Sequence, residues 1–121
     1  MWETMRAGTI QWDSFIRKRN EREYKDSLPH FVYFIENQSG QMKIGVTENL
    51  ERRFKQLQHA NGEELNIFCF VRLPNKTKAI SFEFFFHDYF CDYRIRGEWF
   101  DGNEIKKAIS GELGKVICFE H

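Results

Sequence analysis

The chain has 121 residues, of which 41% are apolar and 17% aromatic, enough for one compact domain with its own core. This aromatic content excludes a disordered chain, and no apolar run reaches the roughly 20 residues that a membrane span needs. Lysine plus arginine equals aspartate plus glutamate at 18 each, which argues against a purely electrostatic nucleic-acid binder but permits a local basic patch. No signal-peptide pattern opens the chain, so we expect an intracellular protein, cytoplasmic or nuclear, with no membrane partner.

Residues 1–28 are predicted to form an N-terminal helical extension. Apolar and basic side chains recur there at helical spacing and the helix should end before Pro29; the residues that set the spacing are Trp12, Phe15, Ile16 and Arg19. Two interpretations are open for its charged stretch, residues 17–22. A helix docked on the domain with a solvated face is favoured over a basic arm on a phosphate backbone, because nearby acidic residues dilute the basicity.

Residues 29–121 are predicted to form one α+β domain with a small, mostly antiparallel sheet flanked by helices. In chain order we expect a strand over 30–36, a turn at 37–40, a strand over 42–46, a helix from an N-cap at Thr47 to about 59, a strand over 66–73, a helix over 77–91, a loop at 94–97, a short helix over 103–110 started by Asp101, and a last strand over 115–119.

Two polar side chains stand in the predicted hairpin. Tyr33 is flanked by apolar residues, and Lys43 is a cation between two apolar residues, where its ammonium needs water or a partner. An odd hairpin loop, such as residues 37–41, would place both side chains on one face, whereas an even loop would separate them. Taken alone, Tyr33 fits a core aromatic with its hydroxyl at the edge, and Lys43 fits an edge-strand lysine that blocks aggregation.

Two further residues are placed by helix phase. Leu50, Phe54 and Leu57 form the apolar stripe of the helix after the hairpin; Arg53 then lies at the border of this stripe while Arg52 points away. Glu83 lies inside a phenylalanine-rich helix, where a carboxylate needs a partner. His87 follows one turn later, so the two fit either a solvent-exposed Glu–His pair or a metal ligand with a histidine beside it.

The three cysteines, Cys69, Cys91 and Cys118, have apolar sequence neighbours and are expected to be reduced and mostly buried. His87 and Cys91 have the spacing of half a zinc site. No CxxC pair completes this site, so zinc is disfavoured.

Several short motifs follow one another over residues 30–110. They are Val32-Tyr33, Lys43-Ile44-Gly45, Asn49-Leu50-Glu51-Arg52-Arg53, Glu83 with His87, and Gly97-Glu98-Trp99-Phe100. Their order and spacing resemble the GIY-YIG nuclease superfamily, and most of all its small phage- and virus-associated branch, which has KIG in place of YIG. Phe31 stands where better-known members of that superfamily have the first glycine of GIY.

This resemblance implies a GIY-YIG-like fold and a metal-dependent endonuclease that hydrolyses DNA phosphodiester bonds with Mg²⁺ or Mn²⁺. It implies that Tyr33 positions or deprotonates the attacking water, that Lys43 replaces a second tyrosine and that Arg53 clamps the phosphate. Glu83 would bind the metal, with His87 in the catalytic group. We expect the substrate to contact Gly45, Arg52, Lys55 and Trp99.

Other functions remain open. The residues at Phe31 and Lys43, which depart from the GIY-YIG pattern, favour a catalytically inactive nucleic-acid-binding or protein-interaction module on the same fold. A closed pair of Glu83 with Arg53 or His87, which would prevent metal binding, would further support this alternative. A protein–protein adaptor would require an exposed apolar patch around residues 82–90. Because the chain is neutral, we expect weak DNA binding by the domain alone, strengthened by a homodimer, by the N-terminal helix or by a targeting partner protein.

Overall fold

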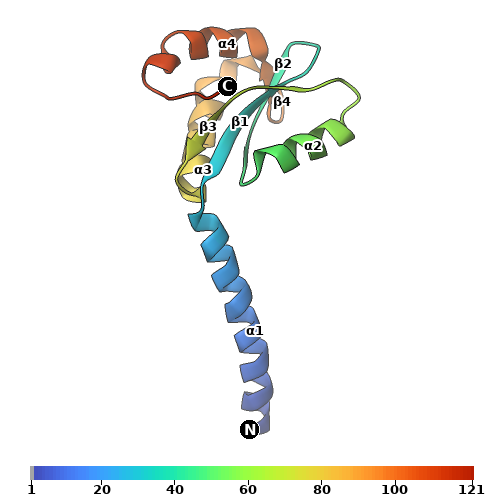
Figure 1. Ribbon diagram of the computed structural model, residues 1–121, viewed down its shortest axis with the longest axis vertical. Coiled ribbons are helices and arrows are strands. Elements are labelled where there is room, and N and C mark those ends of the chain that lie inside the picture. The colour runs from blue at the N-terminus through green and yellow to red at the C-terminus, as the bar shows by residue number, and fades with distance from the viewer. Residues whose placement is uncertain (1) are drawn as a thin grey trace.

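The computed structural model describes residues 2–121, with side chains described from residue 14 onward, and shows the predicted α+β architecture (Figure 1). Its elements, in chain order, are α1 (Trp2–Ser27), β1 (His30–Glu36), β2 (Gln41–Thr47), α2 (Leu50–Ala60), β3 (Asn66–Leu73), α3 (Lys76–Tyr89), the 3-10 turn η1 (Cys91–Tyr93), β4 (Arg94–Arg96), β5 (Trp99–Asp101), α4 (Gly102–Ser110) and the 3-10 turn η2 (Leu113–Lys115).

The five strands form one antiparallel sheet in the order β3-β1-β2-β5-β4. In the β1–β2 hairpin, Tyr33 lies opposite Gly45 and Ile35 lies opposite Lys43. Gly40, with a φ of +80°, provides the left-handed residue of the connecting turn. Side chains alternate between the two faces along each strand, so Tyr33 and Lys43 share a face, as an odd loop predicts.

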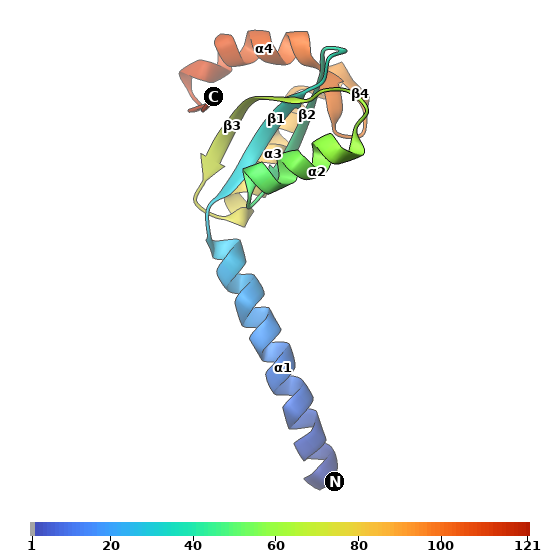
Figure 2. The same cartoon turned by 45° about the vertical axis from the view of Figure 1, so that its right-hand side comes forward.

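Helices cover the two faces of the sheet differently (Figure 2). On one face, α3 and α4 enclose the larger core, whose buried members include Val32, Phe34, Ile44, Phe86 and Phe100. On the other face, α2 covers a smaller cluster built on Tyr33, Ile35 and Leu65, with Leu50, Phe54 and Leu57 supplying the apolar stripe of the helix. The phenylalanine-rich helix α3 packs one face on this core, with Ala79 and Phe86 buried, while Ile80, Phe84, Phe85 and Tyr89 are exposed.

Helix α1 extends away from the sheet (Figure 1) and ends at Ser27, two residues before Pro29, as predicted. Near its end Asp26 pairs with Lys76 of α3, with 3.6 Å between the carboxylate oxygen and Nζ. The helix is therefore docked on the domain, as the favoured interpretation has it, only at its C-terminal end, where α1 contacts α3. Trp12 lies outside the described side chains. Within the described residues, no helix has the length and apolarity to cross a membrane.

Helix α2 begins later than predicted. Thr47 belongs to β2, and its hydroxyl bonds to the backbone of Asn49 rather than starting the helix. Asn49 is the N-cap, with extended backbone and a side-chain oxygen that accepts from the Arg52 amide at 2.9 Å. Both residue types can cap a helix, and the pairing of β2 with β1 through Thr47 decides between them.

Two predictions near the C-terminus are wrong. Residues 94–96 form β4 rather than a loop; all three side chains are exposed, so no apolar alternation marks the strand, and pairing with β5 creates it. Residues 115–119 do not form a strand. A 3-10 turn covers Leu113–Lys115, and a single bridge joins Glu120 to Phe70. The apolar pattern reflects Ile117 and Phe119, which pack on the larger core.

The cysteines are free, as predicted, but only Cys69 is buried. Burial raises the pKa of the Cys69 thiol to about 12. Cys91 and Cys118 are exposed, so the prediction that the cysteines are mostly buried is wrong for both. Cys91 follows the last turn of α3, outside the packed face of that helix.

The close approach of the Tyr33 hydroxyl to Gly45 predicts that a side chain at position 45 lowers the stability of the fold. A Cβ at position 45 would overlap the Tyr33 hydroxyl, so we expect Gly45→Ala to lower the free energy of unfolding by about 1–3 kcal/mol through overpacking. Gly62→Ala is the matched control, because a Cβ there meets nothing within 4 Å. Urea denaturation compares the two variants. Equal stability of Gly45→Ala and Gly62→Ala would contradict this packing.

Candidate functional site

The first part of the site is the Tyr33 hydroxyl, which lies above Gly45. Tyr33 points from β1 toward the α2 face and is only 1% exposed. Because Gly45 has no side chain, the phenol ring extends over β2, and its hydroxyl lies where a Cβ of residue 45 would be. This glycine therefore brings a polar group from the inner strand β1 over the neighbouring strand β2.

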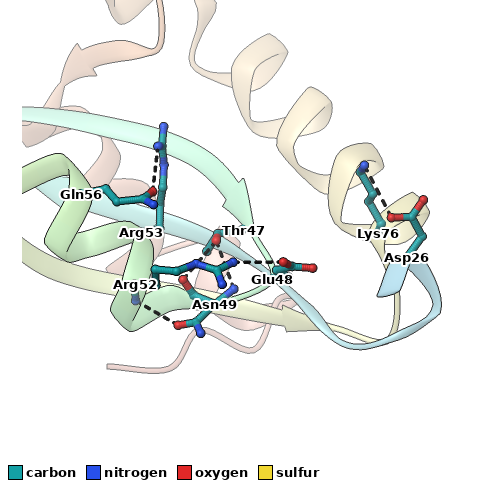
Figure 3. A network of polar contacts seen from close by, with 8 residues as sticks. All are labelled: Asp26, Thr47, Glu48, Asn49, Arg52, Arg53, Gln56 and Lys76. Atoms are coloured by element: carbon teal, nitrogen blue, oxygen red, sulfur yellow. Dashed lines mark hydrogen bonds and ion pairs between the residues drawn. The ribbon is translucent and has the colours of Figure 1, made fainter. Parts of the chain in front are cut away.

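Arg53 approaches the same hydroxyl from α2. It is half-buried at the border of the apolar stripe, as its helix phase predicts. Its Nε donates to the Tyr33 hydroxyl at 3.5 Å, and its Nη1 donates to the Gln56 side chain at 3.5 Å (Figure 3 shows the second contact). Both partners are neutral. Among the described residues, no carboxylate forms an ion pair with Arg53, so its positive charge is available to an anion.

The neighbouring cations of α2 differ from Arg53. Arg52 pairs with Glu48 at 3.0 Å (Figure 3), and Lys55 pairs with Glu51 at 3.1 Å. Both pairs are exposed i,i+4 contacts, which contribute little to stability but neutralise the local charge. Arg52 and Lys55 were predicted to contact the substrate, and the structure places them on the solvent side of α2, away from Tyr33.

Lys43 lies on the same face as Tyr33, but its ammonium has a partner of its own. Its Nζ lies 2.9 Å from the Glu98 carboxylate and 5.6 Å from the centre of the Trp99 ring. The Lys43 side chain is 14% exposed, so this pair satisfies a largely buried cation. Glu98 lies within one of the short motifs, but no role is predicted for it, because a largely buried lysine indicates that a carboxylate is needed without indicating which one.

At Ile44, the backbone of β2 forms hydrogen bonds with two other segments, the one that contains Glu98 and helix α3. The Ile44 amide donates to the Glu98 carbonyl at 3.1 Å, and the Ile44 carbonyl accepts from His87 Nε2 at 3.0 Å. The other ring nitrogen of His87, Nδ1, accepts from the Arg94 guanidinium at 3.3 Å. Through these contacts His87 joins α3 to β2. Since both nitrogens have partners, this geometry favours a structural task for His87 over metal binding or proton transfer.

Glu83 lies one turn before His87 on α3. Burial raises the pKa of its carboxyl, the Glu98 carboxylate raises it further, and the charges of His87 and Lys43 act in the opposite direction. The carboxylate makes no hydrogen bond or ion pair within the described part of the chain, so the closed pair with Arg53 or His87 does not form. Over the same residues, no group of three or more His, Cys, Asp and Glu side chains is placed to hold a metal ion.

The predicted residues therefore fall into two groups beside the β2 edge. Tyr33, Gly45 and Arg53 lie together on the α2 face. Glu83 comes from α3, behind the sheet, and its electrostatic neighbours Lys43 and Glu98 connect it to the same region. Strand β5 pairs with β2 over Gln41–Lys43 only, so Gly45 lies beyond the end of this neighbouring strand.

A comparison with family models matches residues 30–116 to the T5orf172 domain. No curated protein and no solved structure shows a significant match. The matched family is phage-associated, as the predicted branch is, but it differs from GIY-YIG. The resemblance to the GIY-YIG superfamily is therefore wrong as a family assignment, the GIY-YIG-type endonuclease class is wrong with it, and a GIY-YIG-like fold is not confirmed. With most of its length matched, the chain belongs to the T5orf172 domain family.

Proposed function

We propose that the α2 face of β2 binds the phosphate backbone of DNA, with Arg53 as the residue that contacts a phosphate. The T5orf172 family is nuclease-like and DNA-binding, which supports a nucleic-acid-related role. The observation that carries the proposal is the half-buried Arg53 guanidinium, which is oriented by Tyr33 and Gln56 and has no carboxylate partner among the described residues.

Arginine suits this task because its planar guanidinium donates several hydrogen bonds in a fixed plane. In Arg53, Nε and one Nη1 hydrogen have neutral protein partners, which leaves the remaining N–H groups for two oxygens of a phosphate. The net charge of zero implies modest, strongly salt-dependent affinity. Binding by this face therefore depends on a locally unpaired cation rather than on the charge of the whole chain.

The finer form of the proposal is phosphodiester hydrolysis assisted by Mg²⁺ or Mn²⁺. Glu83 fits such a cation, because its partly buried carboxylate has no protein partner in the described residues and Mg²⁺ takes one or two carboxylates together with substrate phosphate and water. A divalent cation bound by Glu83 would neutralise charge on the phosphate and on the leaving oxygen. A single carboxylate with substrate phosphate and water suits Mg²⁺ or Mn²⁺, whereas zinc sites take three or four protein ligands.

The protein residues have separate tasks in this proposal. Arg53 binds a non-bridging phosphate oxygen and holds the Tyr33 hydroxyl through its Nε. The hydroxyl proton of Tyr33 is then directed away from Arg53, where it can position the attacking water. Lys43 and Glu98 neutralise each other and keep the charge beside Glu83 balanced.

A second candidate function is DNA binding without cleavage. One observation favours it: Tyr33 is only 1% exposed, so a water molecule reaches its hydroxyl only if Arg53 moves or the substrate opens this contact. Separate measurements of binding and cleavage distinguish the two candidates.

Replacement of Arg53 tests the binding step. We expect Arg53→Ala to weaken binding of a 20-base-pair duplex by about 10- to 100-fold, the equivalent of about 1.5–3 kcal/mol for a charged hydrogen bond. The slope of log affinity against log salt should fall by about one. Fluorescence anisotropy measures both. Arg72→Ala is the matched control, because Arg72 is an exposed arginine on the edge strand β3 with its guanidinium 6.0 Å from the Phe31 ring. An equal loss in both variants would contradict a specific site at Arg53.

Cleavage is tested on supercoiled plasmid with Mg²⁺, Mn²⁺ or EDTA. We expect the wild type to nick the plasmid with either metal, and Glu83→Gln and Tyr33→Phe to lose at least about 100-fold in rate while still binding DNA. Glu64→Gln, an exposed carboxylate before β3, is the control that keeps activity. If the wild type binds DNA and cleaves it with neither metal, the binding-only candidate is correct.

The raised pKa of Glu83 predicts a pH dependence of stability. A raised carboxyl pKa means that the folded state binds more protons than the unfolded state between the ordinary value near 4.5 and the raised value. The free energy of unfolding of the wild type, relative to Glu83→Gln, should therefore fall as the pH rises through this window. Denaturation over pH 3–8 measures it, and NMR titration with Mg²⁺ should lower the Glu83 pKa. Parallel curves for the two proteins would contradict the burial of an unpaired carboxyl.

A further inference from the structure

A polar hollow lies beside the candidate site, between the β1–β2 turn, the segment after α2 and the β4–β5 hairpin. Its volume is about 470 Å³, within the range of about 300–1,000 Å³ that is typical of small-ligand sites. The residues that line it include Asn37, Gln41, Asn61, Glu63, Arg96 and Trp99. None of them belongs to the phosphate-binding residues proposed above.

Trp99 supplies an aromatic wall that the fold holds in place. The half-buried ring packs against the cluster of Tyr33 and Ile35, and Lys43 lies 5.6 Å from its centre. The next residue, Phe100, fills the larger core on the other face, whereas Trp99 borders the hollow. A fixed indole beside an open volume is the arrangement on which a nucleobase stacks.

Several side-chain oxygens of the hollow already accept hydrogen bonds, and the second oxygen of the Glu63 carboxylate is the acceptor left over among these side chains. The Asn37 side-chain oxygen accepts from the Gln41 amide at 2.9 Å, the Gln41 oxygen accepts from Asn37 Nδ2 at 3.1 Å, and the Asn61 oxygen accepts from the Glu63 amide at 3.1 Å. Glu63 Oε1 accepts from the amide and the hydroxyl of Ser39.

The side-chain NH₂ groups of Gln41 and Asn61 have no partner within the described contacts, and neither has the Arg96 guanidinium. These donors complement a base edge that carries adjacent acceptors. Guanine presents O6 and N7 on one edge, and arginine binds this pair with two hydrogen bonds.

Strand β2 connects the hollow to the phosphate site. Gln41 borders the hollow and Gly45 lies beneath the Tyr33 hydroxyl, four residues later, at a rise of about 3.3 Å per residue or about 13 Å in all. Each nucleotide advances about 3.4 Å along the axis of B-form DNA, and further in an unstacked strand, so this distance corresponds to about four nucleotides or fewer. A single DNA strand along β2 can therefore reach both places.

We propose that this hollow binds one unpaired guanine of the DNA strand, stacked on Trp99 and hydrogen-bonded to Arg96, a few nucleotides from the phosphate at Arg53. The proposal rests on the proposed DNA binding and adds a preference for substrates with an unpaired base. A paired base cannot enter, because its partner strand and its stacked neighbours occupy both of its faces and one edge.

The test measures anisotropy with two duplexes of the same sequence, one fully paired and one with a single bulged guanine. The wild type should bind the bulged duplex about tenfold more tightly. Arg96→Ala and Trp99→Leu should each reduce this preference to less than about twofold, and Arg96→Ala should leave the affinity for the paired duplex unchanged within about twofold. Trp99→Phe should keep most of the preference, and Arg72→Ala should keep all of it. Equal binding of the two duplexes by the wild type, or a preference that survives Arg96→Ala, would overturn the proposal.

A second measurement separates this pocket from the phosphate site. The chain has three tryptophans, so Trp99 is the one that remains in a Trp2→Phe/Trp12→Phe variant. Deoxyguanosine monophosphate should quench its emission, and should still do so after Arg53→Ala, whereas deoxycytidine monophosphate should quench less. Failure of duplex binding with quenching retained would count against the proposed function alone. Equal quenching by the two nucleotides, or none, would count against the guanine pocket.

Discussion

The site depends on one steric constraint, the absence of a side chain at Gly45 opposite Tyr33. Tyr33 is on β1, with a neighbouring strand on each side, where a hydroxyl would otherwise be enclosed. The empty position on β2 gives the phenol room to extend, and the short β5 ends before it reaches Gly45. Arg53 can then meet the hydroxyl from α2. A larger residue at position 45 would displace the phenol and, with it, the group that orients the arginine.

The charges show how a neutral chain can offer a local anion site. Many exposed cations have a nearby carboxylate, as Arg52 does with Glu48 and Lys55 with Glu51. Even the buried Lys43 is matched, by Glu98. Arg53 on α2 and Arg96 on β4 are among the described cations that have no carboxylate partner, and both lie beside the α2 face of β2. Strand β2 therefore links the proposed phosphate contact to the proposed base pocket.

Local rules account for much of the fold and for part of the site. Strand alternation and the odd hairpin loop place Tyr33 and Lys43 on one face, and helix phase places Arg53 at the border of the core. Contacts between distant segments could not be predicted: Lys43 with Glu98, and His87 with the Ile44 carbonyl. The exposed strand β4 carries no apolar pattern. The family assignment failed because motifs of two or three residues do not separate GIY-YIG from T5orf172. The division at residues 28 and 29, the cofactor, and a homodimer or targeting partner remain predictions.

The most direct test of the account is a map of the surface that DNA contacts. Amide chemical shifts of the ¹⁵N-labelled protein, followed as a short duplex is added, report this surface residue by residue. If the α2 face of β2 binds DNA, the largest changes occur at Gly45 and Arg53 and continue along β2 toward Gln41. Changes confined to the exposed side of α3 around Phe84, with none at Gly45 or Arg53, would contradict it.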